Sequence, residues 1–194
     1  MRIAVGSDER AHVTDAVVEH LQQKGIDVEL HGPLGGKPLD WVDVGREVGE
    51  RVASGACQQG VLFCWTGTGV SIAANKVPGI RAALCADAET AAGARRWNDA
   101  NILVMSLRAT PEAVAKEICD AWLEAGPDEG ERETIAKVEG PHPALPQRGR
   151  ETQGPHPALP QRGRETQGPH PALPQRGRET QGHDPALTQR GREN

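Results

Sequence analysis

Residues 60–76 read GVLFCWTGTGVSIAANK, and this stretch decides the fold of the chain. It opens with an apolar run at 61–64, which is typical of a buried parallel strand, and then breaks into the loop Thr66-Gly67-Thr68-Gly69. The residues from Val70 onward can begin a helix. The first N–H groups of a helix have no acceptor within it, and glycines let the backbone come close to a ligand. We therefore expect an anion-binding loop here.

Cys64 ends this strand beside the loop. A thiol next to a helix N-terminus ionises more readily, because the positive end of the helix dipole favours the thiolate. A single cysteine at a strand end is nevertheless more often a small buried apolar residue than a catalyst. The loop also lacks the Gly-Lys-Ser/Thr of a Walker loop, and Ile72 stands where a dinucleotide-binding fingerprint has its third glycine. The stretch thus places a candidate base beside a candidate phosphate site.

The 194 residues divide into two parts. Residues 1–139 mix apolar and polar side chains as one globular domain does. Residues 140–194 form a tail of four repeats, in which GPHPALPQRGRETQ occurs three times and GHDPALTQRGREN ends the chain. The tail is rich in proline and glycine and poor in apolar residues, so its composition predicts disorder. Its histidines recur because the repeat recurs, and they do not indicate a metal site. An Arg-containing interaction tail is the alternative interpretation.

Charge and cysteine usage exclude several classes of function. The chain has a net charge of −5 while its tail carries more Arg than acid, so the acidic excess lies in the domain. An acidic domain is a poor candidate for nucleic-acid binding. The sequence shows no apolar run long enough for a membrane span and no signal-peptide pattern, so we expect a cytoplasmic protein without a membrane partner. The four cysteines have no metal-ligand spacing, so we expect free thiols and no metal.

Strand and helix patterns alternate along the domain. Apolar runs predict strands near 2–5, 27–30, 61–64, 81–85 and 102–105. Helical spacing predicts helices near 13–21, 44–52, from 70, 88–96 and up to 123, the last with Thr110 as N-cap and Pro111 in its first turn. This order predicts an α/β fold of three α/β/α layers, Rossmann-like, with a five-stranded parallel sheet. Because sites in such sheets lie at the carboxyl ends of the strands, we expect Asp8, residues 64–69, Asp87 and residues 98–108 along one edge.

Six segments within residues 1–125 together resemble the family of ribose-5-phosphate isomerase type B and galactose-6-phosphate isomerase. The segments are Gly6-Ser7-Asp8, Cys64-x-Thr66-Gly67-x-Gly69, Ser71-Ile72-Ala73-Ala74-Asn75-Lys76, Gly79-Ile80-Arg81-Ala82-Ala83-Leu84-Cys85, Asn98-Asp99-Ala100-Asn101 and Asp120-Ala121-Trp122-Leu123. The resemblance implies aldose–ketose isomerisation of a sugar phosphate through an enediolate, without a metal or organic cofactor. It also implies a homodimer with shared active sites.

The resemblance assigns roles to individual residues. Cys64 matches the family's base and Thr66 belongs to the catalytic loop. Some members instead place a Glu where this chain has Val70, so by this comparison Cys64 is the only base left. The substrate-binding positions are Asp8, Glu9, Trp65, Gly67, Thr68, Gly69, Trp97, Asn98, Arg108 and Arg132. Arg132, with Lys137 near a second position, matches the phosphate-binding residues presented across the dimer interface.

Three departures from the family bear on the substrate. Glu9 and Trp97 stand where the family usually has histidines, one of which opens the sugar ring, and Trp65 replaces a glycine. One interpretation is an isomerase of a short or acyclic sugar phosphate, which needs no ring opening and fits a pocket narrowed by two tryptophans. The alternative is a catalytically inactive sugar-phosphate-binding homologue. A flavodoxin-like FMN binder is disfavoured because its phosphate loop should follow the first strand. His12 is expected to be a surface helix residue.

Overall fold

The computed structural model of this protein describes residues 1–138, and the predicted tail at 140–194 lies outside the described residues. Five strands form one sheet in the order β2-β1-β3-β5-β4, and every neighbouring pair is parallel. The strands are β1 (Arg2–Ser7), β2 (Asp27–His31), β3 (Gln59–Cys64), β4 (Ala82–Leu84) and β5 (Ile102–Ser106). The predicted five-stranded parallel sheet is confirmed.

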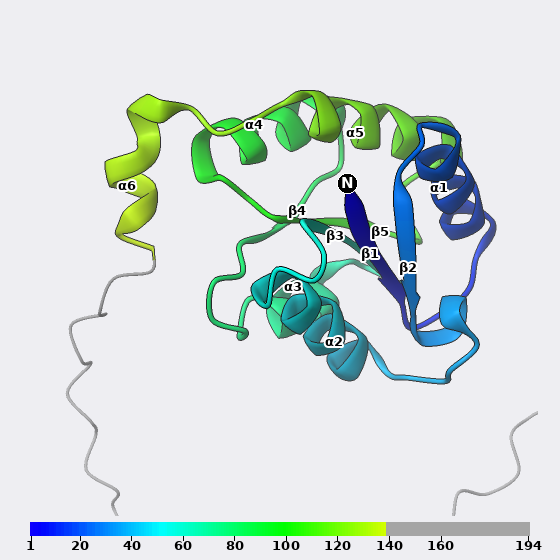
Figure 1. The fold of residues 1–194 in the computed structure, drawn as a ribbon. Helices are drawn as coiled ribbons and strands as arrows, with labels where there is room; N and C mark the ends of the chain where they lie inside the picture. The colour runs from blue at the N-terminus through cyan, green and yellow to red at the C-terminus, as the bar shows by residue number, and fades with distance from the viewer. Residues whose placement is uncertain (139–194) are drawn as a thin grey trace, which may run out of the picture. The chain divides into compact units, whose positions relative to one another are not determined.

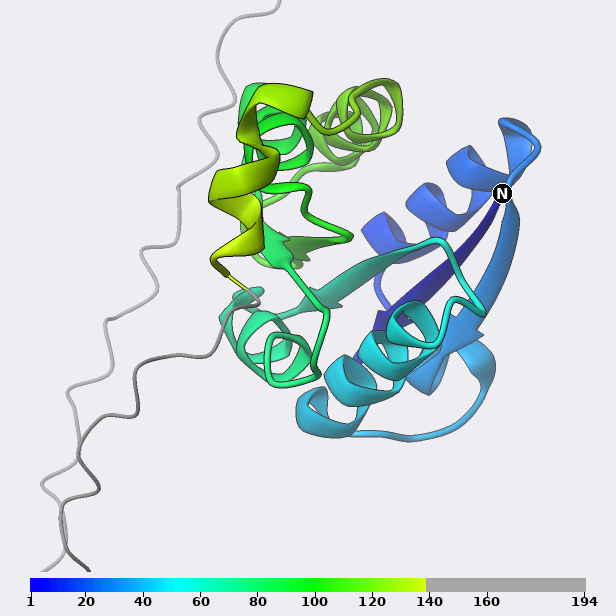
Figure 2. The same cartoon turned by 60° about the vertical axis from the view of Figure 1, so that its left-hand side comes forward.

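Helices cover both faces of this sheet. Figure 1 shows α1 (His12–Gln23), α4 (Ala88–Asn98) and α5 (Glu112–Glu124) over one face, and α2 (Trp41–Ala53) and α3 (Thr68–Ala74) over the other. A short helix, α6 (Arg132–Ala136), and two 3-10 turns, η1 (Gly32–Gly35) and η2 (Glu129–Glu131), complete the described elements. The turned view in Figure 2 shows α6 on the β4 side of the sheet and away from β2. The three-layer α/β/α prediction is thus confirmed.

Alternate residues of β3 enter two separate cores. Val61 and Phe63 pack in the core beneath α1, α4 and α5, whereas Leu62 and Cys64 pack in the core beneath α2 and α3. A strand buried on both faces has no solvent-facing positions for polar side chains. This explains the continuous apolar run that begins the 60–76 stretch. The last residue of that run, Cys64, therefore lies beneath the two helices that flank the glycine loop.

The edge strand β4 is short, and a side chain occupies its free backbone groups. The Asn75 side chain accepts a hydrogen bond from the Ala82 N–H at 2.9 Å and donates one to the Ala82 carbonyl at 2.8 Å. It also donates to the Ser71 carbonyl at 2.9 Å, which ties the end of α3 to this edge. A side-chain amide thus pairs with β4 where a neighbouring strand would.

Some element boundaries differ from the sequence prediction. Helix α5 begins at Glu112 with Pro111 as an extended N-cap, one position later than predicted. The reason is that the Thr110 N–H is hydrogen-bonded to the Ser106 carbonyl at the end of β5, so the helix starts with the Pro111 carbonyl accepting from Ala115. Helix α3 begins at Thr68, two residues before the predicted start, and β4 is shorter than predicted. The turns η1 and η2 and helix α6 were not predicted.

Candidate active site

Cys64 lies at the carboxyl end of β3, directly opposite Ser106 of β5. Cys64 is only 5% exposed and packs in the core beneath α2 and α3. Its carbonyl accepts two hydrogen bonds, from the Gly67 N–H at 3.1 Å and from the Leu107 N–H at 3.0 Å. The backbone that carries the thiol is therefore fixed from two sides, by its own loop and by the residue that follows β5.

The next residue, Trp65, is anchored through its backbone while its ring stays free of the core. The Trp65 carbonyl accepts from the Ser106 hydroxyl at 2.9 Å and from the Arg108 N–H at 3.0 Å. The Trp65 side chain is large, apolar and exposed to solvent, with the residue 61% exposed. The loop after β3 and the loop after β5 are consequently joined, with a tryptophan ring standing at their surface.

Two features fix the glycine loop: a hydrogen bond between two hydroxyl groups, and one glycine with a left-handed backbone conformation. The Thr66 and Thr68 hydroxyl oxygens lie 2.7 Å apart and share a hydrogen bond. Gly67 has φ of 77°, and a Cβ placed there would lie 2.5 Å from the Leu84 side chain and 3.2 Å from the Met105 backbone. Glycine is needed here both for its backbone angle and for the close approach of β5. Gly69 follows within the first turn of α3, beneath the ring of Trp41.

Asp8 follows β1 at the same edge of the sheet and carries an unsatisfied oxygen. Its Oδ1 is buried and has no hydrogen-bond partner among the described residues. Burial raises the pKa of Asp8, and the nearby charges of Glu9 and Asp40 raise it further. Glu9 itself is exposed, and its backbone N–H and carbonyl are held by the Ser7 hydroxyl. A buried acceptor without a partner is unusual, and a bound hydroxyl group would satisfy it.

Arg108 lines an open hollow beside the loop. The hollow has a volume of about 580 Å³, and Thr66, Leu84, Cys85 and Ser106 contribute to its walls together with Arg108. The Arg108 residue is exposed. Its guanidinium is thus available, and its backbone is fixed to Trp65. The structure brings together Cys64, the 65–69 loop and Arg108 as the sequence predicted.

Trp97 and Asn98 lie outside the hollow of Arg108, in a neighbouring hollow that they share with Leu84 and Asp87. Both lie at the end of α4, which starts after β4 and runs back toward the amino ends of the strands. Asn98 lines a cavity of about 480 Å³ together with Gly79 and Ala100, residues that precede β4 and β5. The prediction that residues 98–108 lie along one edge is therefore wrong for residue 98, because the length of α4 carries it away.

Three further residues from the sequence analysis lie on the surface. Arg132 pairs with Glu129 at 2.7 Å, and its side chain is 75% exposed. Lys137 follows α6 and is likewise exposed. His12 is exposed, as expected, and its Nε2 lies 2.7 Å from a Glu112 carboxylate oxygen on α5. The substrate-binding role of Arg132 stays a prediction, with its guanidinium held by a single carboxylate at the surface.

The other thiols are poorly suited to proton transfer. All four cysteines are free and buried. Burial raises the pKa of Cys85 and of Cys119 to about 12 in each case, and it also raises the pKa of Cys57. Such thiols are protonated at neutral pH.

Among the described residues, no cluster of His, Cys, Asp and Glu has the arrangement of a metal site. No helix among residues 1–138 is long and apolar enough to cross a membrane.

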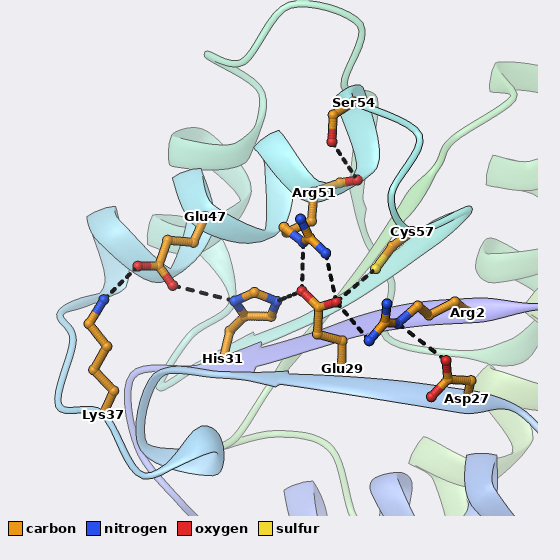
Figure 3. Close-up of polar contacts among 9 residues, drawn as sticks. All are labelled: Arg2, Asp27, Glu29, His31, Lys37, Glu47, Arg51, Ser54 and Cys57. Carbon is orange, nitrogen blue, oxygen red and sulfur yellow. Dashed lines mark hydrogen bonds and ion pairs between the residues drawn. The ribbon is translucent and has the colours of Figure 1, made fainter.

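A polar network between β2 and α2 was not predicted from the sequence. Figure 3 shows Glu29 of β2 at its centre, with the Arg51 guanidinium bound to both carboxylate oxygens at 2.6 and 2.8 Å. These bonds to Arg51 lower the pKa of Glu29. The His31 ring lies between Glu29 and Glu47, at 3.1 and 3.3 Å. The alternation of charges along β2 could have signalled such a network. It ties α2 to the sheet edge on the side away from α3.

Comparison with known proteins now identifies the family. The model of the Ribose/Galactose Isomerase family matches residues 3–138. The chain belongs to this family. It is 39% identical over 128 residues to D-erythrulose-4-phosphate isomerase of Pectobacterium atrosepticum, covering 64% of this chain and 84% of that protein. It is 36% identical over 143 residues to ribose-5-phosphate isomerase B of Escherichia coli, covering 71% and 96%.

The solved structures agree with this assignment. The ribose-5-phosphate isomerase B of Clostridium thermocellum superimposes with a TM-score of 0.68 at 38% sequence identity, covering 72% of this chain and 95% of that one. The resemblance noted in the sequence is thus confirmed, and so is the Rossmann-like fold. The protein is a member of a family of sugar-phosphate aldose–ketose isomerases.

Proposed function

We propose that this protein interconverts an aldose phosphate and a ketose phosphate of short chain length, with Cys64 as the base. The observation that carries the proposal is the position of Cys64 at the carboxyl end of β3, joined to the glycine loop and to the loop after β5. The thiolate takes a proton from the carbon next to the carbonyl, and an enediolate forms. The same proton then returns to the neighbouring carbon, while the hydroxyl proton passes to the former carbonyl oxygen, so the reaction needs no redox partner.

Hydrogen-bond donors in the glycine loop can stabilise the negative charge of the enediolate. The Thr66 and Thr68 hydroxyls lie in the loop that starts two residues after Cys64, and each can turn its proton toward a developing oxyanion. The Oδ1 of Asp8, which has no partner among the described residues, accepts a hydrogen bond from a substrate hydroxyl in this proposal. Arg108 offers an exposed guanidinium for the phosphate.

Two tryptophans favour a short substrate. Trp97 stands where the family usually has the histidine that opens a sugar ring, and Trp65 stands where it usually has glycine. A four-carbon phosphate cannot close an ordinary furanose ring through its phosphorylated end. Its turnover is therefore affected least by the absence of a residue that opens the ring. The 39% identity to a D-erythrulose-4-phosphate isomerase supports the same substrate class.

A homodimer would complete the site in this proposal. Trp97 and Asn98 lie apart from Cys64 within one chain, but the exposed Leu84 lines both the hollow of Arg108 and a neighbouring hollow that contains Trp97. A second copy placed against these apolar groups would cover them and supply Trp97, Asn98 and Arg132 to the partner's loop.

The four free thiols fit a reducing compartment, and we place the reaction in the cytoplasm.

The competing function is binding of sugar phosphates without turnover. The missing histidines at residues 9 and 97 favour it, while the retained Cys64 favours catalysis. A screen of the purified protein against four-, five- and six-carbon aldose and ketose phosphates separates the two. We expect turnover, with the highest kcat/KM on a four-carbon phosphate. Saturable binding without turnover of any of these substrates would establish the binding function instead.

The role of Cys64 is tested by replacing the thiol with a hydroxyl. Cys64→Ser keeps the size of the side chain, but a serine hydroxyl is much less acidic, and the sequence has no histidine beside it to activate it. We expect kcat to fall by at least about 10²- to 10⁴-fold, the usual contribution of a general base. Cys57→Ser is the matched control, because Cys57 packs in the same core but lies beside Glu29. Near-full activity of Cys64→Ser would place the base elsewhere.

A further inference from the structure

Trp41 has no part in the chemistry above, yet its ring lies against the substrate loop. It is the first residue of α2 and is 44% exposed. A Cβ built on Gly69 would lie 2.9 Å from the Trp41 ring, so the ring and the Gly69 backbone are in direct contact. We propose that Trp41 is a positioning residue that holds the 66–69 loop in its substrate-binding conformation. This inference rests on the proposed function of that loop.

The contact lies at the end of a regular row of contacts between α2 and residues 69–77, which comprise α3 from Gly69 onward and the turn that follows it. Residues 41, 45 and 49 of α2 lie one turn apart, and they face residues 69, 73 and 77 in the same order. A Cβ on Gly45 would lie 2.8 Å from the Ala73 Cβ, and one on Gly49 would lie 2.9 Å from the Val77 side chain. Two glycines thus bring the helices close together. The tryptophan ring fills the space at the end of this row where the loop begins.

Helix α2 is a fixed support for that ring. Its glycine side packs on α3, while Glu47 and Arg51 on another side bind β2 through His31 and Glu29, as Figure 3 shows. Its N-terminus is capped by Asp40, whose Oδ1 accepts from the Val42 N–H at 2.9 Å and the Asp43 N–H at 3.0 Å. Trp41 follows this cap directly, so its backbone has little freedom to move.

The ring acts on the loop and not on the base. Cys64 is also held from outside the loop, because its carbonyl accepts from the Leu107 N–H after β5 as well as from Gly67. Gly69 lacks a side chain, and the Trp41 ring occupies the space that such a side chain would fill. Removing the ring lets Gly69 and the start of α3 shift, which misplaces the groups that bind substrate while Cys64 stays in place. We therefore expect a change in substrate binding that exceeds the change in the chemical step.

Steady-state kinetics of the full chain test this role, with whichever sugar phosphate the unmodified protein turns over best. We expect Trp41→Ala to raise KM by about 10- to 100-fold and to change kcat by less than about threefold. Trp41→Phe keeps a flat ring over Gly69 and should restore KM to within about threefold of the unmodified value. Leu30→Ala is the control for loss of an exposed apolar side chain, since Leu30 is 37% exposed on β2.

A double-mutant cycle on thermal unfolding tests the contact itself. Gly69 lies in a helical turn without a left-handed backbone, so an added methyl group favours the helix unless it meets the ring. Gly69→Ala should lower Tm in the unmodified protein and leave Tm unchanged or higher in the Trp41→Ala background. Equal Tm changes in both backgrounds would show that the ring does not press on Gly69 and would overturn the proposal.

The kinetic outcomes are equally decisive. An unchanged KM in Trp41→Ala, or a failure of Trp41→Phe to restore it, refutes positioning of the loop. A fall in kcat that equals the fall in kcat/KM refutes the separation of loop and base. If the unmodified protein neither turns over nor binds any sugar phosphate, the proposed function fails and the role of Trp41 in binding substrate fails with it. The unfolding cycle would still report the contact between ring and glycine.

Discussion

Gly67 is the point at which the glycine loop depends most strongly on a missing side chain. Its backbone has φ of 77°, in the left-handed region, and a Cβ there would meet the Leu84 side chain at 2.5 Å and the Met105 backbone at 3.2 Å. The left-handed conformation costs an alanine about 1–2 kcal/mol. The exposed end of Leu84 can move aside, but the Met105 backbone belongs to β5 and cannot move freely. Overpacking of this kind adds about 1–3 kcal/mol.

Gly67→Ala should therefore lower the free energy of unfolding by about 2–5 kcal/mol. A domain of this size loses about 4 °C in Tm for each kcal/mol, so we expect a fall of about 8–20 °C by calorimetry. Gly55→Ala is the matched control, because Gly55 has φ of 76° and nothing within 4 Å of a built Cβ. It should show the backbone effect alone, about 4–8 °C. If the two variants lose the same Tm, the close approach of β5 to the loop has no energetic consequence.

Three other predictions follow from the site and from the network at β2. Trp97→His should raise kcat/KM for five-carbon phosphates relative to four-carbon ones, and an unmodified protein that already prefers ribose 5-phosphate would contradict the ring-opening argument. Asp8→Asn should raise Tm at neutral pH, since burial disfavours the charged carboxylate, while it weakens turnover. Because Arg51 lowers the pKa of Glu29 in the folded protein, the stability from this pair is present above the unfolded pKa of about 4.3 and is lost as the pH falls through the lower folded value. Glu29→Gln should make Tm lower at neutral pH and less sensitive to acid, and an acid dependence equal to that of the unmodified protein would refute this.

The strand–loop–helix unit could be predicted because its signals are local. The apolar run at 61–64, the glycines at 67 and 69 and the helix that follows are each encoded within a few residues. The parallel sheet follows from the alternation of such units, and with it the position of Cys64 at a carboxyl end. Cys64, Trp65 and Arg108 meet because β3 and β5 are neighbours, and the general rule for parallel sheets anticipates this.

The position of Asn98 could not be read in the same way. Sequence order places it just before β5, and only the length and direction of α4 show that it lies toward the amino ends of the strands. The contact of Trp41 with Gly69 was also beyond reach, since it depends on the close packing of α2 on α3. The charges along β2 indicate that a polar network is present, but they do not specify Arg51, 22 residues away, as the partner of Glu29.

The amide of Asn75 on strand β4 bears on how copies of this protein can meet. An open edge of a sheet is a template on which another chain can add a strand, and such addition leads to aggregation. At Ala82 both outward backbone groups are already occupied by Asn75, and β4 has only two further residues. Two copies therefore cannot extend the sheet through this edge without displacing the amide. Any assembly on the β4 side must be built from side chains, such as Leu84 and the ring of Trp97, and not from shared backbone ladders.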